Sequence, residues 1–176
     1  MKGFLRKRRA GKGKGSVTEI VVFSDTHGRY DLVKKLVERH EKTAKLFLFC
    51  GDGYPQIQTL LTYHPNLPIR CVRGNCDPFE CTWPVEDLVE VDGVKIFFTH
   101  GHKYRVGYGL EELEETARNL GANIACYGHT HVRLEEYRRG LYLFNPGSAG
   151  RSRMGKNSYG VVELSHAGIF TRICDL

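Results

Sequence analysis

Several features common in proteins of this length are missing from this sequence. It has no apolar run close to the ~20 residues that a membrane-spanning helix needs, and no apolar segment typical of a secretory signal peptide follows the first residues. None of its six cysteines forms a Cys-x-x-Cys pair, and most of them lie inside apolar runs. We therefore expect a cytoplasmic protein with reduced thiols.

Two familiar catalytic patterns are also missing. The glycines near Asp52 are not followed by the Gly-Lys-Ser/Thr of a P-loop. Ser24 and Ser148 lack a recognisable base and orienting acid, which disfavours a Ser–His–Asp hydrolase. The chain has no internal repeat and no long linker, so its 176 residues are expected to form one domain with a sizeable core.

The net charge of +6 is unevenly distributed. Residues 1–15 hold seven of the 26 lysines and arginines and no acid, which leaves 19 cations against 20 acids in the rest of the chain. Because this segment is also rich in glycine, it is not expected to fold alone. We interpret residues 1–16 as a flexible basic tail before a domain at 17–176. The tail is either a plain solvated extension or a segment that binds nucleic acid or anionic lipid.

Apolar runs and turn signals predict the order of the elements. The first half alternates strands and helices, as is typical of a parallel sheet, with strands at 17–24, 46–50 and 69–73 and helices at 30–42 and 54–64. The second half begins with a hairpin around Asp92-Gly93, formed by strands at 86–91 and 94–99. It continues with a helix at 109–120 and strands at 123–127, 132–138, 141–145, 159–164 and 168–174. We expect a mixed α/β domain.

Polar residues that can bind metal ions follow five of these apolar runs. The segments are Asp25-Thr26-His27, Gly51-Asp52, Gly74-Asn75-Cys76-Asp77, His100-Gly101-His102 and Gly128-His129-Thr130-His131. Open α/β sheets bind their ligands at the carboxyl ends of the strands. Any one of these segments has an ordinary explanation as a turn, but their shared position after strands favours one site. The other histidines, His40, His64 and His166, lack such a setting and are interpreted as surface residues.

The chemistry of this set favours two metal ions. Carboxylate oxygens together with imidazole nitrogens suit Mn, Fe, Ni or Zn. Two aspartates, one asparagine and up to four histidines are more than one ion uses. Two ions about 3.5–4 Å apart that share a carboxylate would use them all, and such a pair is suited to phosphoryl displacement.

The five segments, in this order, resemble the motif series of the calcineurin-like metallophosphoesterases. Asn145-Pro146-Gly147-Ser148 is similar to a segment of their small prokaryotic phosphodiesterase branch, and the likeness covers roughly residues 17–165. The resemblance implies an α/β fold in which two mixed β-sheets pack as a sandwich flanked by helices. It also implies a dimetal site at the strand ends and catalysis by hydrolysis of a phosphoester.

The resemblance also implies roles for single residues. Asp25, His27 and His131 would bind the first ion; Asn75, His100 and His129 would bind the second; Asp52 would bridge both. A bridging hydroxide, oriented by Asp25, would attack phosphorus. We expect two divalent ions, Mn²⁺ first, with Ni²⁺, Fe²⁺ and Zn²⁺ as alternatives. His102 stays an alternative to His100. Arg73, Arg151 and Arg153 lie near the motifs, where they either bind phosphate oxygens or are simply solvated.

Cys76 departs from the family pattern, in which larger members often carry a histidine that interacts with the leaving group. A thiol is a weaker proton donor, so we expect Cys76 to favour activated or diester substrates.

The predicted function is a phosphodiesterase for a small phosphoester or nucleotide, with nucleic acid as a special case that the tail would favour. The alternative is a protein-interaction scaffold with the same fold, like a retromer subunit. All seven ligand positions are filled, which favours catalysis. The sequence leaves the oligomeric state open.

Overall fold

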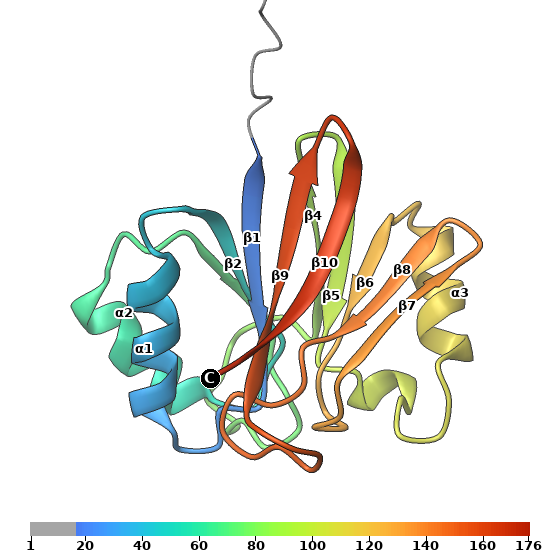
Figure 1. The fold of residues 1–176 in the computed structure, drawn as a ribbon. Helices are drawn as coiled ribbons and strands as arrows, with labels where there is room; N and C mark the ends of the chain where they lie inside the picture. Colours follow the sequence, from blue (N-terminus) through green and yellow to red (C-terminus); the bar gives the residue numbers. More distant parts are fainter. Residues whose placement is uncertain (1–16) are drawn as a thin grey trace, which may run out of the picture.

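The computed structural model describes residues 17–176, so the predicted basic tail at 1–16 lies outside the described residues. Two five-stranded mixed sheets stand side by side in the centre of the molecule, with helices on their outer faces (Figure 1). The predicted α/β sandwich is confirmed. Within residues 17–176, no helix is both long and apolar enough to span a membrane.

The first sheet has the strand order β10-β9-β1-β2-β3. Its parallel part is built from β1 (Thr18–Phe23), β2 (Ala44–Phe49) and β3 (Ile69–Cys71), connected by α1 (Tyr30–His40) and α2 (Tyr54–Tyr63). The hairpin of β9 (Ser158–Ser165) and β10 (Gly168–Asp175) extends it on the other side, because β9 pairs with β1 in antiparallel register. The chain therefore returns to its first strand at the end.

The second sheet has the strand order β4-β5-β6-β8-β7. It contains the hairpin of β4 (Glu86–Val91) and β5 (Val94–Thr99), then β6 (Ile124–Cys126), β7 (Leu134–Arg138) and β8 (Leu141–Asn145). A 3₁₀ turn, η1 (His102–Tyr104), and α3 (Glu111–Asn119) connect β5 to β6, which run parallel. The parallel strands are β1, β2 and β3 in the first sheet and β5, β6 and β8 in the second, and their carboxyl ends point to the same end of the molecule (Figure 1).

Three apolar clusters hold the four layers together. The first lies between the sheets and includes Ile20 and Leu48 from one sheet and Phe98 and Phe144 from the other. A second packs the outer face of the first sheet against α1 and α2, and a third packs the second sheet against α3. Because apolar side chains on the central strands are buried on both faces, these strands appear in the sequence as continuous apolar runs.

The structure corrects several details of the prediction. The 3₁₀ turn η1 was not expected, and β7 begins at Leu134 instead of 132. The sequence predicts the turn of the last hairpin at Ala167-Gly168, but the turn lies at His166-Ala167, because Gly168 already pairs with Ser165.

His40 is not a surface residue. Its side chain is buried, and its ring nitrogens contact Glu19 Oε1 and Tyr159 Oη, each at 2.9 Å. This network ties the end of α1 to β1 and β9, which a sequence pattern does not reveal.

Candidate metal centre

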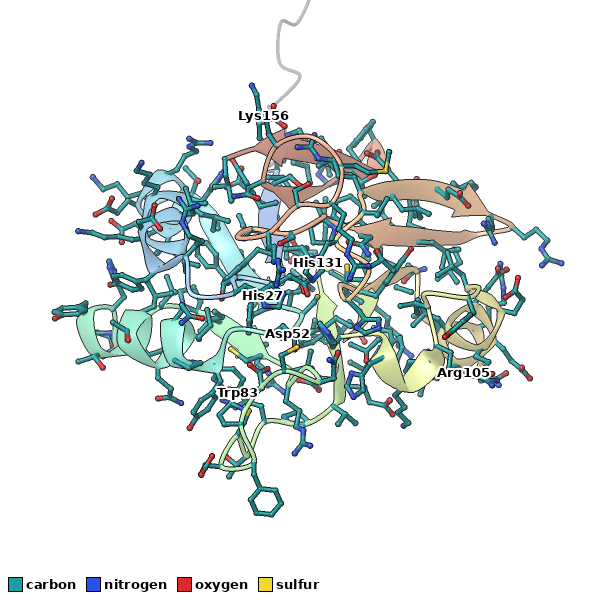
Figure 2. All side chains as sticks on the ribbon, turned by 90° about the horizontal axis from the view of Figure 1, so that it is seen from below. His27, Asp52, Trp83, Arg105, His131 and Lys156 are labelled. Carbon is teal, nitrogen blue, oxygen red and sulfur yellow. The ribbon has the colours of Figure 1, made fainter. Side chains whose placement is uncertain are left out.

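The loops that leave five parallel strands meet at the seam between the two sheets. Asp25, Asp52 and Asn75 follow β1, β2 and β3 in the first sheet, and the histidine segments follow β5 and β6 in the second. Seen along the strands, His27, Asp52 and His131 lie together near the middle of the molecule (Figure 2). The interface between the sheets therefore brings the predicted segments into one site.

The first group of side chains is Asp25, His27 and His131, and their ligand atoms all lie within 4.8 Å of one another. His27 Nε2 and His131 Nε2 are 3.0 Å apart. Asp25 Oδ1 lies 3.1 Å from the His131 nitrogen and 3.7 Å from the His27 nitrogen, and it is buried without an aligned hydrogen bond. One carboxylate oxygen and two ring nitrogens that converge in this way fit a divalent transition metal ion.

The second group is Asp25, Asp52 and His100, again within 4.8 Å. His100 Nε2 lies 3.3 Å from Asp52 Oδ2 and 3.1 Å from Asn75 Oδ1. Asp25 belongs to both groups, so the two groups are adjacent and share a carboxylate. This donor set also fits a divalent ion of the transition series.

Backbone carbonyls orient two of the histidines. His100 Nδ1 donates to the Cys50 carbonyl oxygen and His131 Nδ1 donates to the Arg151 carbonyl oxygen, both at 2.7 Å. A carbonyl only accepts hydrogen bonds, so each ring carries its proton on Nδ1 and directs the Nε2 lone pair into the site. This arrangement is typical of histidines that bind metals.

His129 and His102 complete the second half of the site. The His129 ring centroid lies 5.1 Å from that of His100, and the backbone N–H of His129 donates to Asp25 Oδ2 at 3.1 Å. The His102 ring lies 5.4 Å from the His100 ring, and His102 Nδ1 is buried without a hydrogen-bond partner. Both rings therefore border the second group, although neither belongs to it.

The site holds its carboxylates in the ionised form. Burial alone would raise the pKa of Asp25, but the imidazoles of His131 and His27 outweigh it and leave this pKa well below its ordinary value. Burial opposes ionisation of Asp52 in the same way, and His100 lowers the pKa of Asp52. Contact with Asp25 in turn raises the pKa of His131. The metal-free site thus favours a proton where a cation would otherwise lie.

The backbone around the site is unusual. Asp25, His27, Asp52, His129 and His131 all have positive φ angles, between 40° and 67°. Only a few per cent of residues other than glycine adopt this region. These residues therefore form left-handed turns in the loops that follow the strands. Gly74 is required beside them, because a Cβ at this position would collide with the Asp52 carboxylate.

A model of the calcineurin-like phosphoesterase superfamily domain matches residues 19–167. The chain belongs to this superfamily. Its members are metal-dependent hydrolases of phosphoester bonds, and the donor sets described above agree with that chemistry.

Two relatives by sequence and one solved structure illustrate this likeness. A probable metallophosphoesterase of Bacillus subtilis, YsnB, is 34% identical over 89% of this chain and 90% of its own length. The phosphodiesterase MJ0936 of Methanocaldococcus jannaschii is 26% identical over 82% of this chain and 92% of its own length. The structure of Vacuolar Protein Sorting 29 from Cryptosporidium parvum has a TM-score of 0.74 and 19% identity, and covers 91% of this chain and 92% of that one. The last likeness concerns the fold alone.

Asp77 contributes to the phosphoesterase site in a way that the sequence did not reveal. Its carboxylate accepts hydrogen bonds from four backbone N–H groups, those of Asp52 (3.0 Å), Gly53 (2.7 Å), Tyr54 (2.8 Å) and Gly74 (2.7 Å). These groups belong to the loops after β2 and β3. Asp77 therefore fixes the loop that carries Asp52 against the loop that carries Asn75.

The segment Asn145-Pro146-Gly147-Ser148 also supports the site from behind. Asn145 Nδ2 donates to the Gly128 carbonyl oxygen (3.0 Å) and to Thr130 Oγ1 (3.1 Å), and Ser148 Oγ donates to the Asp25 carbonyl oxygen (2.7 Å). Both side chains are buried. The resemblance pointed to this segment without giving it a role, and the structure shows that it braces two of the left-handed turns.

Three arginines beside the site differ from the rest. Within residues 17–176, the side chains of Arg73, Arg151 and Arg153 form no hydrogen bond or ion pair. Every other arginine in this range has a partner, and these partners are Asp31, Tyr159, Asp87, Glu112, Glu114, Asp175, Glu136 and Glu163. These three are the arginines that the sequence placed near the motifs. Their guanidinium groups are free to bind an anion.

Cys76 is exposed, and its thiol lies beside Asn75. Asn75 Nδ2 donates to Cys76 Sγ at 3.3 Å, which leaves Asn75 Oδ1 facing His100 Nε2. The backbone N–H of Cys76 donates to Asp52 Oδ1 at 2.8 Å. Partial burial and the neighbouring Asp52 carboxylate raise the pKa of the Cys76 thiol to about 11.

Proposed function

We propose that this chain is a dimetal-dependent phosphodiesterase that hydrolyses a small phosphoester or nucleotide, with Mn²⁺ as the first metal to test. The observation that carries the proposal is the convergence of His27 Nε2, His131 Nε2 and Asp25 Oδ1 at 3.0 to 3.7 Å. Such close approach of electron-pair donors is stabilised by a cation. The second donor group beside it supports a second ion.

In this proposal Asp25, His27 and His131 would hold one ion, and Asn75, His100 and His129 would hold the other. Asp52 would serve both ions, and Asp25, which belongs to both donor groups, would assist it. When bound, the two ions would lower the pKa of a water between them and offset negative charge on the phosphoryl oxygens.

The remaining chemistry belongs to the side chains around the ions. Arg73 and Arg151 would bind the non-bridging oxygens of the ester, since a free guanidinium matches phosphate oxygens in pairs. Arg153 would contact the organic part of the substrate. Asp25 would accept a hydrogen bond from the attacking water and fix its direction. Cys76 would lie near the leaving group and donate a proton only weakly, because its pKa is far above neutrality. These roles favour esters with good leaving groups, and diesters over monoesters.

The scaffold alternative is not favoured by any specific observation. The likeness to Vacuolar Protein Sorting 29 fits it, but at 19% identity this likeness concerns only the fold. The complete set of donor side chains supports the enzyme instead.

The test is a metal-supplemented assay of the full chain. Protein freed of metal with a chelator and reloaded with Mn²⁺ should bind about two ions per chain and hydrolyse bis(p-nitrophenyl) phosphate faster than p-nitrophenyl phosphate. The chelated protein should be inactive. Protein that holds two ions and hydrolyses neither compound would overturn the proposal in favour of the scaffold.

A matched control separates the site from general effects of losing a histidine. His131→Ala should abolish both activity and the binding of one ion, because His131 lies in the first donor group. His166→Ala should change neither, because His166 is exposed in the last hairpin turn, away from the site.

A further inference from the structure

A pocket of about 420 Å³ adjoins the candidate metal centre on the side of the second sheet. His129, one of the proposed metal ligands, forms part of its wall. Pockets for small organic ligands begin at about 300 Å³. A substrate whose phosphoryl group lies at the metal pair would therefore have this pocket within reach of one of its ester groups.

Most of the wall of this pocket is apolar. Val106, Leu110, Val132 and Leu134 line it. Val106 and Leu110 belong to the apolar cluster that packs the second sheet against α3, and Leu134 packs against that cluster. Because these side chains are fixed by the core behind them, the pocket is preformed and binds an apolar group without first having to order its walls.

Four side chains with polar atoms line the pocket, those of Tyr127, His129, Thr130 and Arg153. Thr130 Oγ1 already accepts from Asn145 Nδ2 and from the Val132 N–H. Arg153 also lines the pocket, and within residues 17–176 its guanidinium has no partner. A guanidinium stacks well on the face of an aromatic ring. Apolar walls that include the Tyr127 ring, together with an unpaired guanidinium, suit a planar ring better than a sugar or a charged group.

We propose that this pocket is a subsite for an aromatic ring carried by one ester group of a phosphodiester substrate. The ring would lie between the aliphatic wall and Arg153 while the phosphoryl group lies at the metal centre. A nucleobase and a simple aryl group share this chemistry. The inference rests on the proposed function for the placement of the phosphoryl group.

Gly107 offers a direct test, because it lines the pocket and open space surrounds the position of an added Cβ. Its φ lies outside the positive range, so other residues fit its backbone. The series Gly107→Ala, Gly107→Leu and Gly107→Trp should fill the pocket in steps. Tyr108→Ala is the control, because Tyr108 is the next residue, is 96% exposed and does not line the pocket.

The readout is calorimetric binding to Mn²⁺-loaded protein, which needs no turnover. Phenylphosphonate and methylphosphonate carry the same head group on a bond that cannot be hydrolysed. Phenylphosphonate should bind the unaltered protein at least about tenfold more tightly, because its ring is removed from water. That preference should shrink along the Gly107 series and disappear in Gly107→Trp, while methylphosphonate affinity stays within about twofold. Tyr108→Ala should keep the full preference.

Thymidine 5′-phosphate, the product of a nucleotide diester, distinguishes the two sources of the ring. Tighter binding than phenylphosphonate supports the subsite with a nucleobase as its occupant, and weaker binding supports it with a simple aryl group. Circular dichroism and metal content establish that each variant is folded and loaded, and Gly107→Leu carries the test if Gly107→Trp does not fold.

Equal affinity for the two phosphonates, or a preference that survives Gly107→Trp, would overturn the subsite. These outcomes are separate from a failure of the proposed function. Loss of the ring preference in a protein that hydrolyses diesters contradicts the subsite alone. A ring preference in a protein that binds two ions but hydrolyses nothing contradicts the phosphodiesterase alone.

Discussion

His27 Nε2 and His131 Nε2 lie 3.0 Å apart, and they come from the loops that follow β1 and β6, one in each sheet. The Nδ1 proton of His131 is committed to the Arg151 carbonyl oxygen, so its Nε2 is an acceptor in the neutral ring. Two such nitrogens can approach this closely only with a proton or a cation between them. Proton and metal ion therefore compete for the same place.

This competition predicts a pH dependence of metal binding. The pKa of His131 is raised above its ordinary value of 6.5, so this ring holds its extra proton up to a higher pH in the metal-free fold. Its stabilising pair with Asp25 is fully present below pH 6.5 and is lost as pH rises through the raised pKa. The increase in melting temperature on adding Mn²⁺ should therefore be larger at pH 8 than at pH 6. Thermal melts with and without Mn²⁺ at both values measure this, and an equal increase contradicts it.

Asp52→Asn tests the bridge between the ions. An amide lacks the charge of the carboxylate and cannot bind two cations equally well, so we expect both sites to weaken together. Metal content should fall clearly below two ions per chain, and diester hydrolysis should fall by more than about 100-fold. Elemental analysis after gel filtration measures the first quantity. If Asp52→Asn keeps two tightly bound ions and full activity, Asp52 is not the bridge.

Asp77→Asn tests the support of the site. The carboxylate accepts four backbone N–H groups, and an amide would turn an NH₂ group toward some of them. We expect a loss of about 1–3 kcal/mol in the free energy of unfolding, together with weaker metal binding. Asp87→Asn is the control, because Asp87 pairs with the exposed Arg70, and this pair is worth at most about 1 kcal/mol. Equal losses in the two variants, measured by urea titration, would remove the special role of Asp77.

Cys76→His tests the weak proton donor. An imidazole with a pKa near 6.5 donates a proton far more readily at neutral pH than the Cys76 thiol, whose pKa is raised to about 11. Alkyl leaving groups need that proton and nitrophenolate hardly does. Cys76→His should therefore raise the rate on alkyl phosphoesters more than on nitrophenyl esters, within the roughly 10²–10⁴-fold range of general acid catalysis.

Cys76→Ala completes this comparison. It should keep most nitrophenyl ester hydrolysis, since the ions and their ligands remain. A ratio of rates on the two substrate types cancels a uniform change in metal occupancy. Loss of nitrophenyl ester hydrolysis in Cys76→Ala with both ions bound would show that the thiol takes a direct part.

The sequence was informative about the site where chemistry and position coincide. Asp25, Asp52 and His100 each follow a largely buried parallel strand, and Asn75 follows the parallel edge strand β3. The carboxyl ends of parallel strands lie on one edge of a sheet. The order of the segments then made the family recognisable. The order of strands and helices was predictable for the same reason, since buried strands form apolar runs and turns such as Asp92-Gly93 are marked by their residues.

What the sequence did not reveal depends on contacts between distant segments. The carbonyl oxygen of Cys50 that orients His100 has no signature in the sequence, because every residue has a carbonyl. Asp77 resembled an ordinary turn residue, and only the fold brings four N–H groups to it. The apolar pocket beside His129 is assembled from three separate segments of the chain, residues 106–110, residues 127–134 and Arg153. His40 looked like a surface residue because its partners, Glu19 and Tyr159, lie on other elements.

The left-handed turns at Asp25, His27, Asp52, His129 and His131 have a consequence for how this protein can change over evolutionary time. Each such conformation costs about 1–2 kcal/mol for a residue with a Cβ, and glycine adopts it freely. Replacement of one of these residues by glycine therefore removes a metal ligand and relieves the backbone at the same position. A lineage released from selection for hydrolysis would lose its metal ligands readily while keeping the two sheets. The architecture is thus predisposed to yield inert descendants that persist as folded proteins.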